Sequence, residues 1–419
     1  MVELVFGQSR SGLFLMVKTM KRREFLSQGA ALGLGLSLST WGFAQAPRNA
    51  AGKGPRLLFV LLRGGMDTDS LLFQHANPFY YEQRPNIAVA RQGFADDDQR
   101  INTLWAMHPA LEPLFPWVQK KELAFVPFTG TQDNSRSHFK AQEILERGMV
   151  QGQARAQNGL LNRILVELSK EHTNLGGVNF VKGVPLICAG SAEFPYVDLK
   201  QRSDAKGERL DQNMKALREM YLDPNTNERL KAVSAKQTGA RDTLRMQMDY
   251  DMEHGAMASA TPGVQAQFEQ VAHLMKAGGP FSVGFVEVNG WDTHQGQGNE
   301  VGLLSGKLGQ LAQALAAFAQ AMGPAWAETH LVAMSEFGRT FAENGTKGTD
   351  HGHGSTMMLM SGKPYTDSVL GEQRQLRPEH LHEQRDAPIL NPYKQVLLDQ
   401  VLRRMGLSAA AAKRALLLT

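Results

Sequence analysis

The sequence predicts an α/β fold, a three-layer α/β/α sandwich with a mostly parallel central sheet. Continuous apolar runs at residues 56–62 and 281–288 are typical of strands buried on both faces. Segments with helical periodicity alternate with such runs, and strands that alternate with helices form parallel sheets covered on both sides. Polar residues able to bind a metal follow several of these runs, at the sheet edge where α/β enzymes hold their ligands.

The length and charge of the chain narrow its class. The 419 residues suffice for one large domain, which we assign to residues 47–419. Residues 1–46 hold five of the 45 basic residues and two of the 41 acidic ones, which leaves 40 and 39. A nearly neutral domain indicates no nucleic-acid partner. The single cysteine, Cys188, excludes an intrachain disulfide.

Residues 1–46 predict a twin-arginine signal peptide and therefore a periplasmic or secreted protein. Paired arginines followed by Phe-Leu precede a short apolar run at 29–40, and small residues then provide a cleavage site after Ala46 or Ala44. The run is too short to span a bilayer, so we expect no stable membrane span once the signal is removed. Residues before Met20 add nothing to the signal, which makes Met20 an alternative start.

The elements predicted between these landmarks follow one another in alternation. Strands are expected at 56–62, 123–128, 184–189, 281–288 and 331–334, and helices at 138–148, 160–170, 301–322 and 395–405. A long polar segment with helical pattern, about 198–276, is interpreted as a helical insertion.

The first candidate ligand, Asp67, follows the first strand across Gly64 and Gly65. Glycines there let the backbone turn sharply and approach a ligand, and a carboxylate at a strand end suits a cation. The alternative is an Asp that caps a helix. Asp69 is a weaker candidate for the same role.

A second group, Arg136 and Ser137, follows the second strand and opens a helix. Ser137 there could act as a nucleophile beside backbone N–H groups that favour an anion, and Arg136 could clamp that anion. The alternative is a helix cap with a solvated arginine. Ser135 is a rival nucleophile.

Asp292 and His294, two residues apart after the strand at 281–288, combine a hard oxygen with an imidazole. This pairing suits zinc, manganese or iron, although a hydrogen-bonded turn with an exposed histidine would look the same in sequence.

The stretch after the strand at 331–334 is the densest in metal-binding residues. Glu336 follows that strand directly, and His351 and His353 come soon after, with Asp350 before them. One histidine could ligate while its neighbour supports it. Arg339 is a further anion-binding candidate, and we expect structural roles for the other nine histidines, His108 and His138 among them.

Taken as a set, these motifs resemble a known family. The matching segments are 62–67, 107–111, 136–139, 291–294, 335–339 and 349–353. The order of strand–Asp, strand–Ser, strand–Asp-x-His, strand–Glu and loop–His is similar to the alkaline-phosphatase-like superfamily, which includes sulfatases. More closely, residues 56–407 resemble the bacterial family called domain of unknown function 1501.

The resemblance implies an α/β/α sandwich with a metal site at the sheet edge. Matched position by position, Asp67 takes the first-strand ligand, Ser137 the nucleophile, Asp292 and His294 one metal pair, and His351 or His353 the late histidine. Glu336 stands where the superfamily has an Asp followed by His or Asn.

Phe337 follows Glu336 instead of that second ligand, and the Asp-x-His spacing is shorter than in alkaline phosphatases. We therefore expect one or two divalent ions, or none, with zinc first and manganese, magnesium or calcium as alternatives. The expected function is an exported, metal-dependent hydrolase of phosphate or sulfate esters, acting on small molecules or polymers. The alternative is a non-catalytic exported protein that keeps the fold and binds a cell-envelope partner.

Overall fold

The computed structural model describes residues 2–9, 12–19, 54–90, 100–149, 156–173, 175–199, 263–276 and 281–418. The chain divides into two compact units, Met1–Arg48 and Asn49–Thr419. In the first unit, β1 (Val2–Ser9) and β2 (Gly12–Thr19) pair as an antiparallel hairpin. The predicted signal motif and its cleavage site, residues 21–46, lie outside the described residues.

The second unit is built on a seven-stranded sheet with the order β11-β6-β10-β9-β3-β8-β7. Every neighbouring pair is parallel except those that β10 makes with β6 and β9. The strands are β3 (Arg56–Arg63), β6 (Leu123–Gly130), β7 (Gly176–Asn179), β8 (Phe281–Asn289), β9 (Thr329–Met334), β10 (Ser355–Ser361) and β11 (Asn391–Pro392). The predicted mostly parallel sheet is confirmed.

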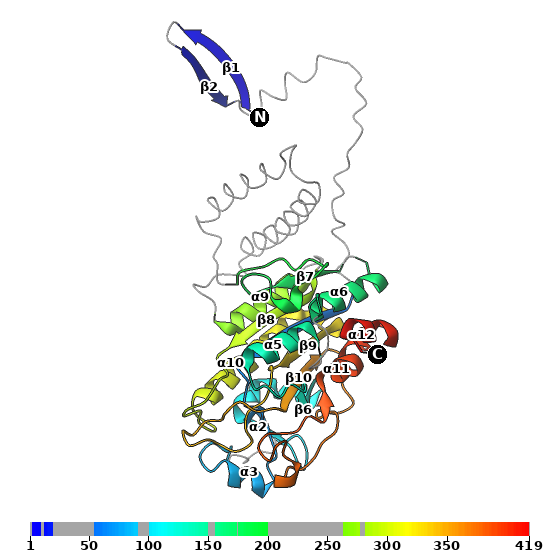
Figure 1. Ribbon diagram of the computed structural model, residues 1–419. Helices are drawn as coiled ribbons and strands as arrows, with labels where there is room; N and C mark the ends of the chain where they lie inside the picture. Colours follow the sequence, from blue (N-terminus) through cyan, green and yellow to red (C-terminus); the bar gives the residue numbers. More distant parts are fainter. Residues whose placement is uncertain are drawn as a thin grey trace. The chain divides into compact units, whose positions relative to one another are not determined.

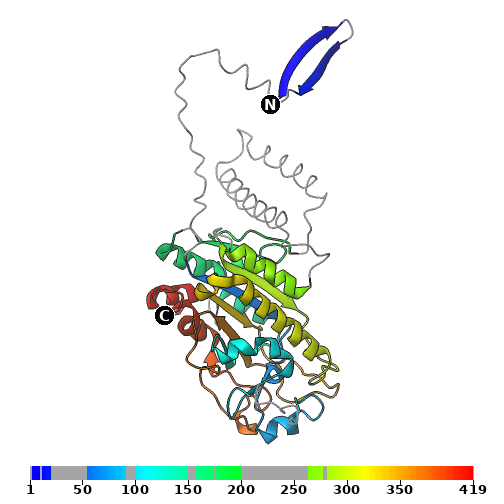
Figure 2. The ribbon, with the colours of Figure 1, turned by 180° about the vertical axis from the view of Figure 1, so that it is seen from behind.

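Helices cover both faces of this sheet (Figures 1 and 2). In β3, Leu57 and Phe59 join the core under α6 (Leu160–Glu171) and α12 (Ala409–Leu416), whereas Leu58 and Val60 join the core under α9 (Val264–Lys276) and α10 (Leu303–Met322). Alternate residues of a strand point to opposite faces, so a wholly apolar strand requires cover on both sides. The three-layer arrangement follows.

Shorter elements complete the unit. They are α2 (Thr68–Leu71), β4 (Leu72–Phe73), α3 (Pro78–Gln83), β5 (Ala106–Met107), η3 (Pro109–Leu114), α4 (Phe115–Gln119), α5 (His138–Arg147), η4 (Leu186–Cys188), η5 (Gly323–Glu328), η6 (Pro378–His380), α11 (Tyr393–Val396) and the π-helical turn η7 (Leu397–Leu402). Within the described residues, no helix is both long enough and apolar enough to cross a membrane.

Most predicted elements are present, but two assignments were wrong. The strand expected at 184–189 is the 3₁₀ turn η4, whose Ile187 packs in the core beside α6. Composition cannot distinguish a short buried run from a strand, and Pro185 lacks the N–H that a strand would use. The insertion expected at 198–276 ends too late, because α9 is a core helix packed on α10. Residues 200–262 lie outside the described residues.

The carboxyl ends of β3, β6, β8 and β9 meet at one edge of the sheet. The antiparallel β10, which the sequence did not reveal, starts at that same edge, since Ser355 pairs with Thr129 near the end of β6. The loop that precedes Ser355 therefore joins the loops that follow the four parallel strands. This single strand reversal brings His351 to the other candidate residues.

Gly64 and Gly65 allow two close approaches at this edge. Both have positive φ, and a Cβ on Gly64 would lie 2.8 Å from the backbone nitrogen of Asp292. A Cβ on Gly65 would lie 2.3 Å from the ring of Phe337. Glycine is needed at both positions for space as well as for conformation.

We expect Gly65→Ala to lower the free energy of unfolding by at least about 2 kcal/mol, because backbone strain adds to overpacking against Phe337. Gly296→Ala is the matched control: Gly296 has a similar φ of 51° against 61°, and a Cβ placed on it would have nothing within 4 Å. It should cost about 1 kcal/mol. Equal losses in denaturant unfolding would contradict the close approach.

Candidate metal centre

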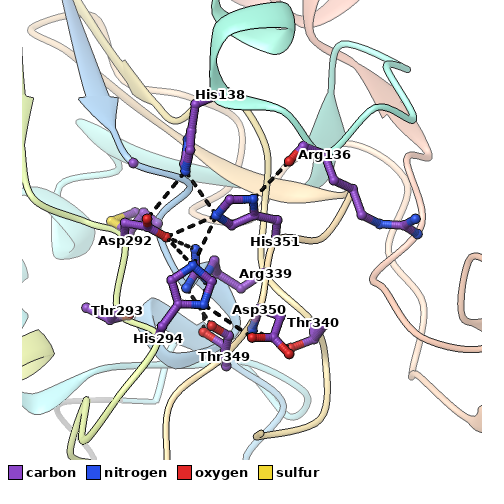
Figure 3. Close-up of polar contacts among 12 residues, drawn as sticks. Arg136, His138, Asp292, Thr293, His294, Arg339, Thr340, Thr349, Asp350 and His351 are labelled. Carbon is purple, nitrogen blue, oxygen red and sulfur yellow. Dashed lines mark hydrogen bonds and ion pairs between the residues drawn. The ribbon is translucent and has the colours of Figure 1, made fainter.

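Four side chains from three loops converge at the edge of the sheet (Figure 3). His138 opens α5, Asp292 and His294 follow β8, and His351 precedes β10. The Nε2 atom of His351 lies 3.0 Å from Nε2 of His138 and 3.2 Å from Nε2 of His294. Asp292 Oδ1 lies 3.2 Å from Nε2 of His351 and 2.9 Å from that of His294.

The other nitrogen of each ring is held by an oxygen acceptor. Nδ1 of His138 lies 2.7 Å from Glu336 Oε1, that of His294 lies 3.2 Å from Asp350 Oδ1, and that of His351 lies 2.9 Å from the Arg136 carbonyl oxygen. A carbonyl or an ionised carboxylate only accepts, so each Nδ1 carries the hydrogen. In the neutral rings, each Nε2 is therefore a bare lone pair.

Three Nε2 lone pairs and a carboxylate oxygen that face one another repel unless a cation lies among them. Ligand atoms of His138, Asp292 and His351 all lie within 4.8 Å of one another, the spread that a shared metal ion requires. Histidine ligands that donate their second N–H to a carboxylate or carbonyl are the usual arrangement around protein-bound metals. The residues present therefore fit a divalent cation.

The donor set narrows the choice of ion. Three imidazoles and one carboxylate suit zinc, manganese or iron, whereas magnesium and calcium prefer oxygen ligands throughout. Zinc, the first expectation from sequence, and manganese therefore suit this set better than the other expected alternatives, magnesium and calcium.

Arg339 fixes the orientation of Asp292. Its Nη1 donates to Asp292 Oδ1 at 2.5 Å, and its Nε and Nη2 donate to Oγ1 and the carbonyl of Thr349. Burial opposes ionisation of Asp292, but the hydrogen bond and charge of Arg339, together with the charges of His294 and His351, outweigh it and hold the pKa of that carboxyl below its usual value. Arg339 is fully buried, so its predicted role as an anion-binding residue is replaced by this one.

Glu336 supports the centre from behind and is not itself a ligand. Its carboxylate is fully buried and accepts hydrogen bonds from His138, Gln142, Ser335 and the Gly64 N–H. The hydrogen bond to Glu336 raises the pKa of the His138 ring. The carboxylate lies at the predicted edge, but it faces a histidine nitrogen instead of a metal ion.

Asp67 is not brought to the cluster. Its fully buried carboxylate forms a two-point ion pair with Arg84, at 2.7 and 3.1 Å, and also accepts from Ser70 and Gln297. Its oxygens are thus occupied, and the predicted metal-ligand role is corrected. Asp69 also faces Arg84, at 3.7 Å.

Arg136 turns its guanidinium away from the cluster (Figure 3). The side chain pairs with Asp386 and Glu383, each at 2.6 Å, so it is not placed as the predicted anion clamp. Its backbone has a φ of 50°, a conformation uncommon outside glycine, and its carbonyl oxygen holds His351. The main chain of Arg136, rather than its charge, serves the site.

His353 lies outside the cluster, which corrects its assignment as a ligand. Its ring stacks on that of His382, with centroids 4.1 Å apart, and its Nδ1 faces the Asp133 carbonyl. Burial lowers the pKa of His353 to about 4. Of the two histidines left open by the sequence, His351 is the one in the centre.

His138 is a residue of the cluster that sequence reasoning missed, because we expected a structural role for it. Its Nε2 lies 3.0 Å from that of His351. In the sequence it follows Ser137 directly and opens a helix beside the sheet edge. That position was the available signal. Ser137 itself is the N-cap residue of α5, and its hydroxyl makes no capping bond. The rival Ser135 donates to Asp133 Oδ2 at 2.5 Å.

Phe337 forms one wall of the centre. Its ring centroid lies 4.8 Å from that of His138 and 5.1 Å from that of His351, and its side chain is buried. An apolar ring thus fills the place next to Glu336 where the resembling superfamily carries a ligand. The arrangement fits one ion.

Purified protein should bind about one zinc ion, and His351→Ala should weaken that binding by more than about 100-fold, since outer partners alone contribute about 10–100-fold. His75→Ala, a histidine distant in sequence from the centre, is the control. Unchanged affinity in His351→Ala, measured by competition with a chelating dye, would refute the centre.

Zinc affinity should fall as pH falls, because a protonated imidazole cannot ligate. Since the Glu336 hydrogen bond raises the pKa of His138 in the metal-free protein, a proton competes at higher pH than for an ordinary histidine. Glu336→Gln should therefore lower the pKa of the His138 ring in the metal-free protein, measured by NMR titration between about pH 5 and 8. A pKa that stays unchanged or rises in this variant would contradict this role.

Comparisons with known proteins give a family and no named function. No curated protein matches the chain. Among solved structures, it is similar to the C-terminal periplasmic domain of EcEptC from Escherichia coli in complex with Zn, with 10% identity, 74% of each chain covered and a TM-score of 0.34. It is also similar to the lipoteichoic acid synthase LtaP from Listeria monocytogenes, with 11% identity, 78% of this chain and 68% of that chain covered, and a TM-score of 0.30.

At these TM-scores we draw nothing from either structure about activity. The profile of the family described as "Protein of unknown function (DUF1501)" matches residues 55–414. Because that match covers most of the chain, the protein belongs to the DUF1501 family.

Proposed function

We propose that the protein is an exported, metal-dependent hydrolase of phosphate or sulfate esters. The observation that carries the proposal is the convergence of three bare imidazole nitrogens and a carboxylate at one sheet edge. The side chains of Asp292 and His294 are about two-fifths exposed, at 41% and 40%. Structural metal sites are closed by their ligands, so an open side favours a site that receives a substrate.

The start of α5 supports an anionic substrate. This ten-residue helix begins at His138, so its free backbone N–H groups and positive dipole end lie next to the ligand cluster. An ester oxyanion would bind between these groups and the cation. When bound, the cation would stabilise negative charge on an ester oxygen.

Ser137 is our candidate nucleophile. It is flanked by the Arg136 carbonyl, which holds His351, and by His138, so its main chain passes along the cluster. The hydroxyl does not cap α5, and the residue is half-buried. Ser135, in contrast, is committed to Asp133. We therefore retain Ser137, and not Ser135, as the nucleophile of the expected serine mechanism.

The charges around the site favour esters that carry one negative charge. The two arginines expected to clamp an anion are engaged elsewhere, Arg339 with Asp292 and Arg136 with Asp386 and Glu383. Asp292 and Asp350 both present exposed carboxylates. A sulfate monoester or a phosphodiester would meet less repulsion than a phosphate monoester with two charges.

These features predict a rank order among chromogenic esters. The zinc-loaded protein should hydrolyse p-nitrophenyl sulfate or bis(p-nitrophenyl) phosphate faster than p-nitrophenyl phosphate. Ser137→Ala should lower kcat by at least about 1000-fold at unchanged zinc content, because it removes the attacking oxygen. Ser135→Ala is the matched control. Full activity in Ser137→Ala would exclude the serine mechanism.

A non-catalytic binding role is the second candidate. Arg136 and Arg339 are held in ion pairs, and Phe337 stands where a phosphatase-like site would carry a ligand. Both features favour a binding role over catalysis. Zinc binding without hydrolysis of any of the three esters would support this candidate.

We keep export by the twin-arginine route as part of the proposal. Arg22→Lys combined with Arg23→Lys should leave the protein in the cytoplasm of a host strain.

A further inference from the structure

The ion pair between Asp67 and Arg84 has no part in the site described above, although Asp67 follows the turn at Gly64 and Gly65. Both side chains are fully buried, and Arg84 also donates to the carbonyls of Thr340 and Phe341. Burying a charged pair is costly unless each charge is matched by partners. A pair with this many partners has a fixed orientation.

Gln297 connects this pair to two of the three segments that carry the cluster residues. Its Nε2 donates to Asp67 Oδ2 at 2.6 Å, and its Oε1 accepts from Thr293 Oγ1 at 2.9 Å and from Thr349 Oγ1 at 3.3 Å. Thr293 stands between the ligands Asp292 and His294. Thr349 receives two hydrogen bonds from Arg339, which in turn holds Asp292.

Asp67 fixes which group donates and which accepts in the hydrogen bonds that link Gln297 to Thr293 and Thr349. An ionised carboxylate only accepts, so Gln297 must present its amide N–H₂ to Asp67 and its oxygen to the two threonines. Each threonine has one hydroxyl hydrogen, and both are used on Gln297 Oε1. The Thr349 oxygen is then left as an acceptor for Arg339 Nε.

All the members of this network are buried. Asp67, Arg84, Gln297 and Thr349 have no exposed surface, and Thr293 and Arg339 are only 1% exposed. A buried polar network whose members are all satisfied holds its side chains rigidly, and it loses that rigidity when one member is removed. Here the loss of one member would affect the position of Asp292 in two ways, through Thr293 and through Arg339.

We propose that Gln297, oriented by the Asp67–Arg84 ion pair, is a positioning residue that sets the geometry of the metal centre. It holds the turn between Asp292 and His294 through Thr293, and it sets the Arg339 contact with Asp292 through Thr349. The proposal rests on the metal centre but not on ester hydrolysis, and its test measures metal binding alone.

The test compares Gln297→Met with Gln74→Met in the full-length protein. Gln74 is a second buried glutamine whose amide bonds go to Asn77, Arg374 and Leu376, so both variants remove a buried, hydrogen-bonded amide of similar size. Zinc affinity and the visible absorption spectrum of the Co²⁺-loaded protein are measured for each. The spectrum reports ligand geometry, which a loss of stability alone does not alter.

Gln297→Met should bind zinc about 10–100-fold more weakly than the unchanged protein, in the range for partners that orient metal ligands. Its Co²⁺ spectrum should shift, while Gln74→Met keeps both properties. Wild-type affinity and spectrum in Gln297→Met would overturn the proposal. If the unchanged protein binds neither ion, the metal centre fails and this role fails with it, whatever the ester assays show.

A second pair of variants covers the case in which Gln297→Met does not fold. Thr293→Val removes the hydroxyl that donates to Gln297 at constant shape, whereas Thr293→Ser retains it. The valine variant should lose zinc affinity and shift the Co²⁺ spectrum, and the serine variant should recover most of both. Equal behaviour of the two variants would overturn the proposal.

Discussion

The site depends on one constraint: each histidine of the cluster must carry its hydrogen on Nδ1. Glu336, Asp350 and the Arg136 carbonyl enforce this, because none of them can donate a hydrogen. The three Nε2 lone pairs consequently face inward together with Asp292. Without these acceptors the rings could turn or change tautomer, and the four groups would form an ordinary hydrogen-bonded cluster.

The sequence could predict the fold and the edge of the sheet that carries the site, because both depend on local patterns. Apolar strands such as β3 and β8 are recognised directly, and polar loops after parallel strands must meet at one edge. Asp292, His294 and His351 are predictable on that basis. His353, two residues from His351, has the same local pattern, and only its stacking on His382 separates the two.

What the sequence could not predict are pairings between distant residues. Asp67 has the pattern of a ligand, but Arg84 and Gln297 take up its oxygens, and nothing in the local pattern reveals these partners. Arg136 has the pattern of an anion-binding residue, but Asp386, 250 residues away, binds it instead. The role of His138 depends on the position of Glu336 behind it. In each case the residue type was visible in the sequence, and a distant partner decided its role.

The same acceptors link the metal to protons. In the metal-free protein, uptake of a hydrogen ion would relieve the repulsion within the cluster, and the hydrogen bond to Glu336 raises the pKa of His138, whereas burial lowers the pKa of His351. A bound proton adds one positive charge to this group of lone pairs, whereas a divalent cation adds two. Metal binding and proton release are therefore coupled in this arrangement. Phe337 packs on the rings of His138 and His351, and the side chains of Asp292 and His294 are the more exposed part of the cluster.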